Sequence, residues 1–154
     1  MALQICLRIQ IISKDLGNDQ IVLLDTGPLV AYLNANDHRH AWAIEILESS
    51  DLPFLSCEAV IAEAYFLLRR DHLSSDALMR LVDEGVIQIA FELNHKIRPI
   101  RELMRRYQSV PMSLADACFV RMSEMYRNAK LVTLDSDFLI YRRDRNAVIP
   151  IVMP

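Results

Sequence analysis

The chain has 154 residues, of which 53% are apolar and 24% are charged, and its formal net charge is −3. These values are typical of one compact globular domain; they exclude a disordered chain and give no bulk charge that would indicate nucleic-acid binding. No stretch approaches the roughly 20 apolar residues that a membrane span needs, and residues 1–12 lack the basic start and cleavage site of a signal peptide.

Short apolar runs bounded by turn residues alternate with helical stretches along the chain. Residues 1–19 precede the first strand and are interpreted as an extension of unknown role, whereas residues 20–154 are expected to form a single domain. Strands are predicted at 20–25, 53–57, 86–91, 130–134 and 148–152. Helices are predicted at 28–33, 37–50, 58–70, 74–84, 94–108, 113–128 and 136–141, with 58–70 largely buried. This alternation indicates an α/β fold in which helices cover both faces of a parallel sheet.

Four acidic residues stand in apolar or helix-opening surroundings: Asp25, Glu63, Asp116 and Asp135. Asp25 and Asp135 each end a strand-like run, and parallel sheets of this kind bind ligands at the carboxyl ends of their strands. A carboxylate near a core is costly unless it is paired or ligates a metal. Four such residues therefore indicate one shared site for a hard cation, and the chemistry they predict is metal-assisted phosphoryl chemistry.

Each of these acids also has a purely structural interpretation. Asp25 and Asp135 are placed to cap helices that follow strands, and the charge of Asp116 suits the positive end of a helix dipole. Glu63 lies in the middle of a helix, where a structural ion pair with Arg70 is the alternative. The joint placement of the four acids favours the shared site.

Basic charge is concentrated in the second part of the chain. Residues 1–95 hold 6 Lys or Arg against 14 Asp or Glu, whereas residues 96–154 hold 11 against 6. Of the 17 basic residues 14 are arginines, whose planar guanidinium suits phosphate oxygens. A solvated, ion-paired helix face is the alternative interpretation of each arginine. The candidates for contact with a phosphate backbone are Arg98, Arg101, Arg105, Arg106, Arg142, Arg143 and Arg145.

The cysteines and histidines do not indicate a catalytic or metal site of their own. Cys6, Cys57 and Cys118 are widely spaced and odd in number, which is typical of a reduced, cytoplasmic protein with thiols packed as small apolar groups. The four histidines are scattered through polar stretches and are interpreted as surface residues, so no histidine is expected to shuttle protons.

Several short motifs, taken together and in order, resemble those of PIN-domain nucleases. They are Leu24-Asp-Thr-Gly-Pro-Leu-Val-Ala31 with Asp37 and His40, the stretch from Ser56 to Glu63-Ala, Leu114-Ala-Asp-Ala117, and Thr133-Leu-Asp-Ser-Asp-Phe138. The resemblance runs from about residue 20 to the C-terminus, and the size of the chain is most similar to that of a VapC-type toxin ribonuclease. The 19-residue lead departs from the family pattern, because such domains commonly begin near the first strand.

The resemblance implies a three-layer α/β/α sandwich around a parallel sheet, usually in a homodimer. It implies that Asp25, Glu63, Asp116 and Asp135 hold Mg²⁺ or Mn²⁺, with Asp137 a further possible ligand and the hydroxyls of Thr133 and Thr26 in support. It also implies RNA as the substrate, contacted by Arg98, Arg101, Arg105, Arg142 and Arg143, and a small antitoxin protein as a partner. Metal-activated water would attack the phosphodiester in line and leave 5′-phosphate and 3′-hydroxyl ends.

Three other functions remain open at this level. In a receiver-like or phosphatase-like domain, Asp25 would accept a phosphoryl group with the help of a lysine, but Lys130 precedes its strand rather than following it. A non-catalytic metal-binding or RNA-binding module would keep the fold without turnover. A housekeeping RNA-processing nuclease would keep the chemistry without an antitoxin.

Overall fold

The computed structural model describes residues 21–154, so the predicted extension of residues 1–19 lies outside the described residues. At its centre is a five-stranded sheet with the order β3-β2-β1-β4-β7, in which all neighbouring strands are parallel. These strands are β1 (Val22–Leu24), β2 (Phe54–Ser56), β3 (Ile87–Ile89), β4 (Lys130–Val132) and β7 (Ile151–Val152). Two further strands, β5 (Arg142–Arg143) and β6 (Ala147–Val148), form a separate antiparallel pair.

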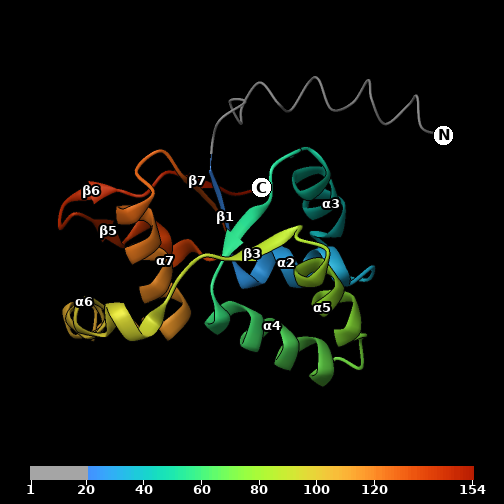
Figure 1. Cartoon of the computed structure of the whole chain (residues 1–154), viewed down its shortest axis with the longest axis horizontal. Coiled ribbons are helices and arrows are strands. Elements are labelled where there is room, and N and C mark those ends of the chain that lie inside the picture. The colour runs from blue at the N-terminus through green and yellow to red at the C-terminus, as the bar shows by residue number, and fades with distance from the viewer. Residues whose placement is uncertain (1–20) are drawn as a thin grey trace.

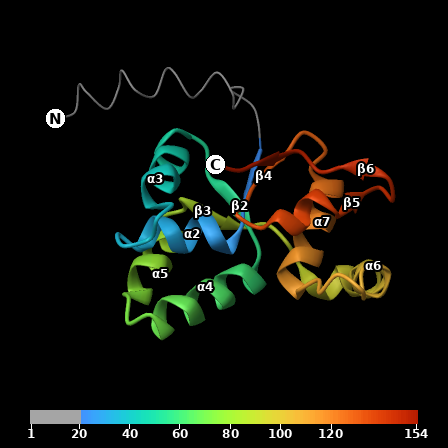
Figure 2. The ribbon, with the colours of Figure 1, turned by 180° about the vertical axis from the view of Figure 1, so that it is seen from behind.

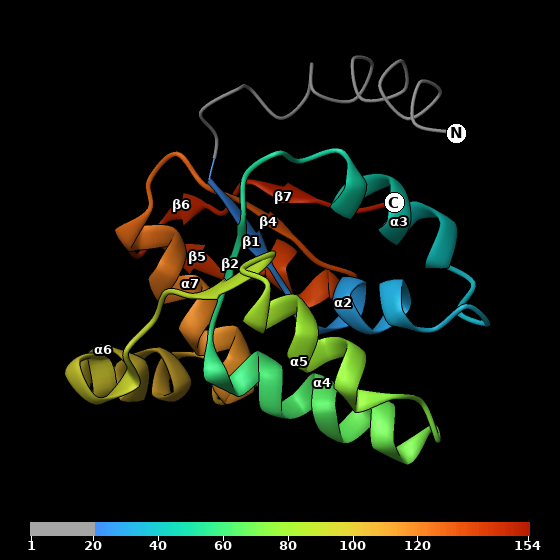
Figure 3. The same cartoon turned by 45° about the vertical axis from the view of Figure 1, so that its right-hand side comes forward.

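Helices lie on both sides of the five-stranded sheet, which confirms the predicted three-layer α/β/α architecture. They are α2 (Thr26–Leu33), α3 (His40–Glu48), α4 (Glu58–Arg70), α5 (Ser75–Asp83), α6 (Leu93–Arg106) and α7 (Leu114–Met125), followed by the 3-10 helix η1 (Ser136–Leu139). In Figures 1 and 3, α7 with α6 beyond it lies on one side of the sheet, and α2, α3 and α5 lie on the other. The view from behind in Figure 2 shows the same division.

The central strand and the helix beside it form the middle of the core. Leu23 and Leu24 of β1 are fully buried, as is expected for a parallel strand covered on both faces. Along α7, Phe119 and Val120 are also fully buried, so this helix presents apolar side chains on more than one face. The end of α7 that carries Asp116 is therefore set rigidly against the sheet.

The prediction that residues 58–70 are largely buried is wrong. Of the thirteen residues of α4, only Val60, Ala64 and Leu68 are buried, and Phe66 is 64% exposed. The helix runs past the side of the molecule on which β1 and β2 end, so only one of its faces packs against the neighbouring helices (Figure 3). The helix therefore carries more apolar side chains than the core covers.

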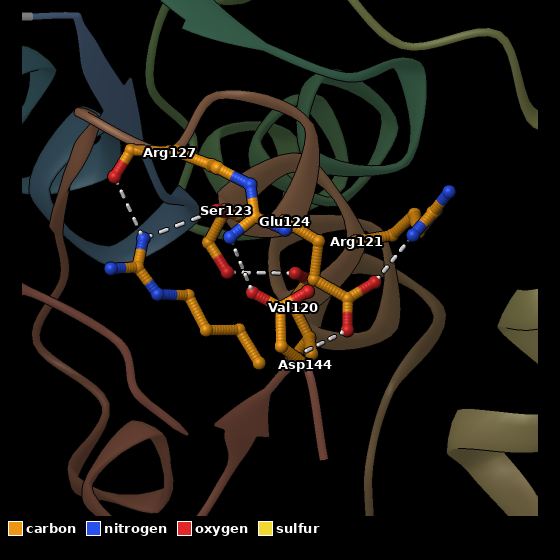
Figure 4. Close-up of polar contacts among 7 residues, drawn as sticks. Val120, Arg121, Ser123, Glu124, Arg127 and Asp144 are labelled. Atoms are coloured by element: carbon orange, nitrogen blue, oxygen red, sulfur yellow. Dashed lines mark hydrogen bonds and ion pairs between the residues drawn. The ribbon is translucent and has the colours of Figure 1, made fainter. Parts of the chain in front are cut away.

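The prediction of a single strand at 148–152 is also wrong, because Pro150 separates β6 from β7. Between β5 and β6 the chain turns through Asp144 and Arg145, whose φ values of 48° and 72° are in the left-handed region. Figure 4 shows what holds this turn against α7. Glu124 accepts hydrogen bonds from the backbone N–H of Asp144 (2.9 Å) and from Nη1 of Arg121 (2.6 Å).

The bounds of α4 coincide with the predicted helix at 58–70. The other predicted elements differ from the observed ones by a few residues at one or both ends, and the predicted helix at 136–141 is the shorter η1. Within residues 21–154, no helix combines the length and the apolar composition that a membrane crossing requires.

Candidate active site at the acidic end of the sheet

Asp25 lies at the carboxyl end of the central strand, where the chain passes from β1 into α2. Its backbone N–H donates to the carbonyl of Val132 on β4 (3.1 Å), so Asp25 lies beside Thr133, the residue that follows β4. Its Oδ2 accepts a hydrogen bond from the Thr133 hydroxyl (2.6 Å), and its Oδ1 accepts one from the N–H of Thr26 (2.7 Å). The carboxylate is therefore fixed from both strands, and it caps α2 as the structural interpretation of this residue predicts.

The glycine of the Asp-Thr-Gly-Pro motif lets these two strand ends approach each other. A Cβ atom built on Gly27 would lie 3.1 Å from Cβ of Leu134, which is closer than most such contacts. A larger residue at this position would push the start of α2 away from the segment that links Thr133 to Asp135. The motif therefore has a packing requirement in addition to its acidic residue.

Asp135 and Asp137 belong to the turn that leads from β4 into η1. The backbone N–H of Asp135 donates to Oγ1 of Thr133 (2.9 Å), so this hydroxyl links Asp135 to Asp25. Oδ1 of Asp135 accepts the N–H of Asp137 (2.9 Å) and thereby caps η1. Both acids are half-buried. Thr133 therefore makes hydrogen bonds to both Asp25 and Asp135.

Asp116 enters the site from the N-terminus of α7, where it forms a reciprocal capping box with Ser113. The N–H of Ser113 donates to Oδ2 of Asp116 (2.8 Å), and the N–H of Asp116 donates to the Ser113 hydroxyl (3.0 Å). Asp116 is only 8% exposed. Ser113 is not among the predicted site residues, although the spacing Ser-x-x-Asp before an apolar helix indicates a capping box from sequence alone.

Glu63 joins the group from α4 through a hydrogen bond to the helix that Asp25 caps. Its Oε2 accepts the hydroxyl of Thr26 (2.7 Å), which gives Thr26 a supporting contact of the kind that the resemblance implies. Glu63 is exposed, so this hydrogen bond, and not burial, is what links it to the other acids. The alternative ion pair with Arg70 is not formed, because Arg70 contacts the neighbouring Asp71 (2.9 Å).

The electrostatics of these carboxylates show that they act on one another. Burial, with the charges of Asp116 and Glu63 adding to it, raises the pKa of Asp25 to about 7 against the hydrogen bonds from Thr133 and Thr26. Burial also raises the pKa of Asp116, with the charges of Asp135 and Glu63 adding to the effect. None of these four acids forms an ion pair with a basic residue in the part of the chain that the structure describes. The negative charge is therefore uncompensated.

The donor set fits a hard divalent cation that keeps part of its water shell. All the donors are carboxylate oxygens, and Mg²⁺ usually binds to one or two carboxylates and several waters rather than to an all-protein cage. Within residues 21–154, no three or more Asp, Glu, His or Cys side chains are placed to hold a metal ion together. Asp25, Asp116 and Asp135 come from three different elements, and they could hold a hydrated cation between them with Glu63 at the edge.

The predicted phosphate-contacting arginines fall into two groups. Arg98, Arg101 and Arg105 are exposed on α6, and no ion pair involves them within the described residues. Arg142 and Arg143 are half-buried and bind backbone carbonyls; Nη1 of Arg142 donates to Leu139, Ile140 and Tyr141, and Nη1 of Arg143 donates to Ser123 and Arg127. The α6 arginines are therefore the ones whose guanidinium groups remain available.

Two other predictions concern residues near this region. His40 is expected at the surface, but it is half-buried and its Nδ1–H donates to the carbonyl of Ala31 (2.8 Å), which joins α3 to α2. Cys57 and Cys118 are buried free thiols, as predicted. They share a hydrogen bond that lowers the pKa of Cys57 and links the start of α4 to α7.

Tyr141 is the residue of this region that the sequence analysis does not single out. Its phenol is fully buried, and after burial the charges of Asp116, Asp137 and Asp135 raise its pKa. A sequence signal does exist, because Tyr141 follows Asp137 by four residues, which is about one helical turn.

Comparison with known proteins agrees with the architecture and identifies the family. The model of the PIN domain family matches residues 22–144. The chain is 28% identical over 132 residues to ribonuclease VapC26 of Mycobacterium tuberculosis. The matched stretch covers 84% of this chain and 93% of that protein. Its fold is similar to the crystal structure of VapC20 of Mycobacterium tuberculosis, a sarcin-ricin loop cleaving toxin, with a TM-score of 0.69, 20% identity, and coverage of 75% of this chain and 91% of that one. The resemblance predicted from the motifs is thereby confirmed.

Proposed function

This chain belongs to the PIN domain family, and we propose that it is an endoribonuclease that depends on a divalent cation, Mg²⁺ or Mn²⁺. The observation that carries the proposal is the group of four carboxylates, Asp25, Glu63, Asp116 and Asp135, whose charges act on one another without a basic partner among the described residues. The similarity to ribonuclease VapC26 supports RNA as the substrate.

The residues of the site would have different roles in holding the cation and positioning its ligands. Asp25, Asp116 and Asp135 would hold the cation, and Glu63 would complete the site through its contact with Thr26. When bound, such a cation supplies a water of lowered pKa and offsets the charge that develops on the phosphate. The Thr133 hydroxyl keeps Asp25 and the Asp135 backbone in fixed relative positions before substrate arrives. The products would be a 5′-phosphate and a 3′-hydroxyl.

The substrate strand would be held by the exposed arginines of α6. Arg98, Arg101 and Arg105 follow one another at spacings of three and four residues, so they lie on one face of the helix. The helix α6 that carries them packs against α7, the helix whose first turn holds Asp116. Guanidinium groups placed in this way contact phosphates and leave the bases of a single strand free.

We further propose that the protein is the toxin of a toxin–antitoxin pair, in which a small antitoxin protein blocks the acidic site, and that it forms a homodimer. Support comes from VapC20, which is described as a toxin and shares the fold. The proposal predicts a short reading frame next to the gene and co-purification of its product. If no such partner exists, a housekeeping role in RNA processing becomes the better interpretation.

The test of the nuclease proposal is cleavage of a mixed RNA pool by purified, inhibitor-free protein. We expect cutting with Mg²⁺ or Mn²⁺ that stops in EDTA and is abolished in the Asp25→Asn and Asp116→Asn variants, with 5′-phosphate ends on the products. Folded protein that cuts no RNA with either metal would contradict the proposal and would favour a binding module without turnover.

A further inference from the structure

The ring of Tyr141 packs in the core against a residue of η1, the short helix that Asp135 caps. It is fully buried and makes edge-to-face contacts with Tyr107 (centroids 5.0 Å apart) and with Phe138 (5.4 Å apart). Its backbone N–H donates to the carbonyl of Asp137 (3.1 Å), so the residue is tied to the turn that carries Asp135. Neither the backbone nor the ring can move far without disturbing this turn.

The hydroxyl of Tyr141 is buried and makes no hydrogen bond with any residue from 21 to 154. This differs from the neighbouring Tyr107, whose hydroxyl accepts the backbone N–H of Arg142 (2.9 Å). Buried polar groups without a partner are uncommon, and each calls for an explanation. If packing alone mattered at position 141, phenylalanine would fill the same space without burying an unpaired hydroxyl.

The groups that this hydroxyl meets are the acids of the site. After burial, the charge of Asp116 is the strongest influence on the phenol, followed by those of Asp137 and Asp135, and all of them favour its neutral O–H form. The hydroxyl approaches the Asp116 carboxylate but does not reach hydrogen-bonding geometry. Oδ2 of Asp116 is already bound by the N–H of Ser113, so its other oxygen is the one that is open to a further donor.

We infer that Tyr141 is a positioning residue of the acidic site: a small movement would let its unpaired hydroxyl donate a hydrogen bond to the Asp116 oxygen that Ser113 leaves open, and so orient this carboxylate toward a divalent cation. The inference rests on the proposed metal-dependent function. With Ser113 on one oxygen and Tyr141 on the other, the orientation of Asp116 would be fixed both from the start of α7 and from the segment that follows η1. Partners of this kind behind a metal ligand orient it and typically change metal affinity by about 10–100-fold.

The experiment is Mn²⁺ binding to RNA-free protein, measured by isothermal titration for the wild type, Tyr141→Phe and Tyr107→Phe. Both variants remove one hydroxyl from the same aromatic cluster and keep its rings. We expect Tyr141→Phe to weaken Mn²⁺ binding about tenfold and Tyr107→Phe to leave it unchanged. Cleavage by Tyr141→Phe should require a correspondingly higher Mn²⁺ concentration for its half-maximal rate.

A double-mutant cycle with Asp116→Asn separates positioning from a general structural effect. In the Asp116→Asn background, removal of the Tyr141 hydroxyl should have no further effect on Mn²⁺ affinity, because both changes act through the same carboxylate. Additive effects, or a Tyr141→Phe protein that binds Mn²⁺ within about twofold of the wild type, would overturn the inference and leave the nuclease proposal standing. A wild-type protein that binds no Mn²⁺ would overturn both.

Discussion

The two ends of α7 carry charge in opposite ways. At its N-terminus, Asp116 joins three other acids, and none of the four has a basic partner within the described part of the chain. Burial and the charges of this group raise the pKa of Asp25 and of Asp116. At its C-terminus, Glu124 binds Arg121, and Arg127 contacts Asp144 of the hairpin (3.3 Å), so each charge faces an opposite one (Figure 4). Paired charges of this kind fasten one element to another, whereas a group of like charges raises the free energy of the folded protein until a cation joins it.

The largest expected difference between the two ends concerns RNA cleavage. Asp116→Asn and Glu124→Gln each replace a carboxylate of α7 by its amide, but only Asp116 belongs to the acidic site. We expect Asp116→Asn to lower kcat/KM for RNA by at least about 100-fold and Glu124→Gln to change it by less than about twofold, in the same assay with Mn²⁺. Equal reductions in the two variants would show that charge on α7 matters only for the fold.

The second difference concerns stability without metal, measured by urea unfolding in EDTA. Because the pKa of Asp25 is about 7 in the folded protein and its ordinary value is 3.8, the folded state holds this proton more tightly than the unfolded state. The wild type should therefore become less stable as the pH rises from about 4 to about 7, and above that range the decrease should be complete.

Asp25→Asn should remove most of this pH dependence and be more stable than the wild type at pH 8, by on the order of 2 kcal/mol. Addition of Mn²⁺ should reverse the order, since only the wild type gains stability from binding. Parallel pH profiles for the two proteins would contradict the assignment of the uncompensated charge to Asp25.

The exposed arginines of α6 are expected to contact RNA phosphates, whereas arginines that bind backbone carbonyls are not. Replacing Arg98, Arg101 and Arg105 together by Gln should weaken binding of single-stranded RNA to a cleavage-deficient Asp25→Asn protein about tenfold at moderate salt. The slope of log affinity against log salt should fall by about 0.7 for each phosphate that the variant no longer neutralises. Arg143→Gln is the matched control, because this guanidinium binds carbonyls at the end of α7. A smaller slope change in the triple variant than in the control would contradict the assignment.

The smallest expected effect is the loss of stability when the ion pair between Glu124 and Arg121 is broken. Glu124→Gln should lower the free energy of unfolding by about 1 kcal/mol, since the amide has no charge to attract Arg121 but can still accept the N–H of Asp144. Thermal unfolding of this variant beside Asp116→Asn provides the measurement. In EDTA we expect the two substitutions to change the free energy of unfolding in opposite directions, with Asp116→Asn raising it. A lower free energy of unfolding for Asp116→Asn would contradict the view that the charge of Asp116 destabilises the metal-free protein.

Much of the site could be predicted because its residues occupy positions with general rules. Asp25 and Asp135 follow strands of a parallel sheet, so their convergence follows from the alternation of strands and helices. Asp116 lies in the first turn of a helix, where an acid is favoured whatever its function. The structural interpretations of these residues are confirmed, since Asp25 caps α2, Asp135 caps η1, and Asp116 places its charge in the first turn of α7.

The features that sequence reasoning missed depend on contacts distant in sequence. The apolar residues of α4 are expected to be buried, but Tyr65 and Phe66 are exposed. The helix lies beyond the strand ends, where the sheet does not cover it (Figure 3). The β5–β6 hairpin has no glycine in its turn, and Glu124, twenty residues away, holds the backbone of Asp144 in place. The unpaired hydroxyl of Tyr141 is likewise a property of the packed core rather than of its sequence neighbours.

An anomalous difference map from crystals of the protein soaked in Mn²⁺ would show where a divalent cation binds. We expect a peak between the carboxylates of Asp25, Asp116 and Asp135, and none at Glu124 or Asp144, whose charges are already paired. A map with no peak at the acidic end, or with its main peak beside the hairpin, would contradict the conclusion that uncompensated charge at this end of the sheet marks the active site.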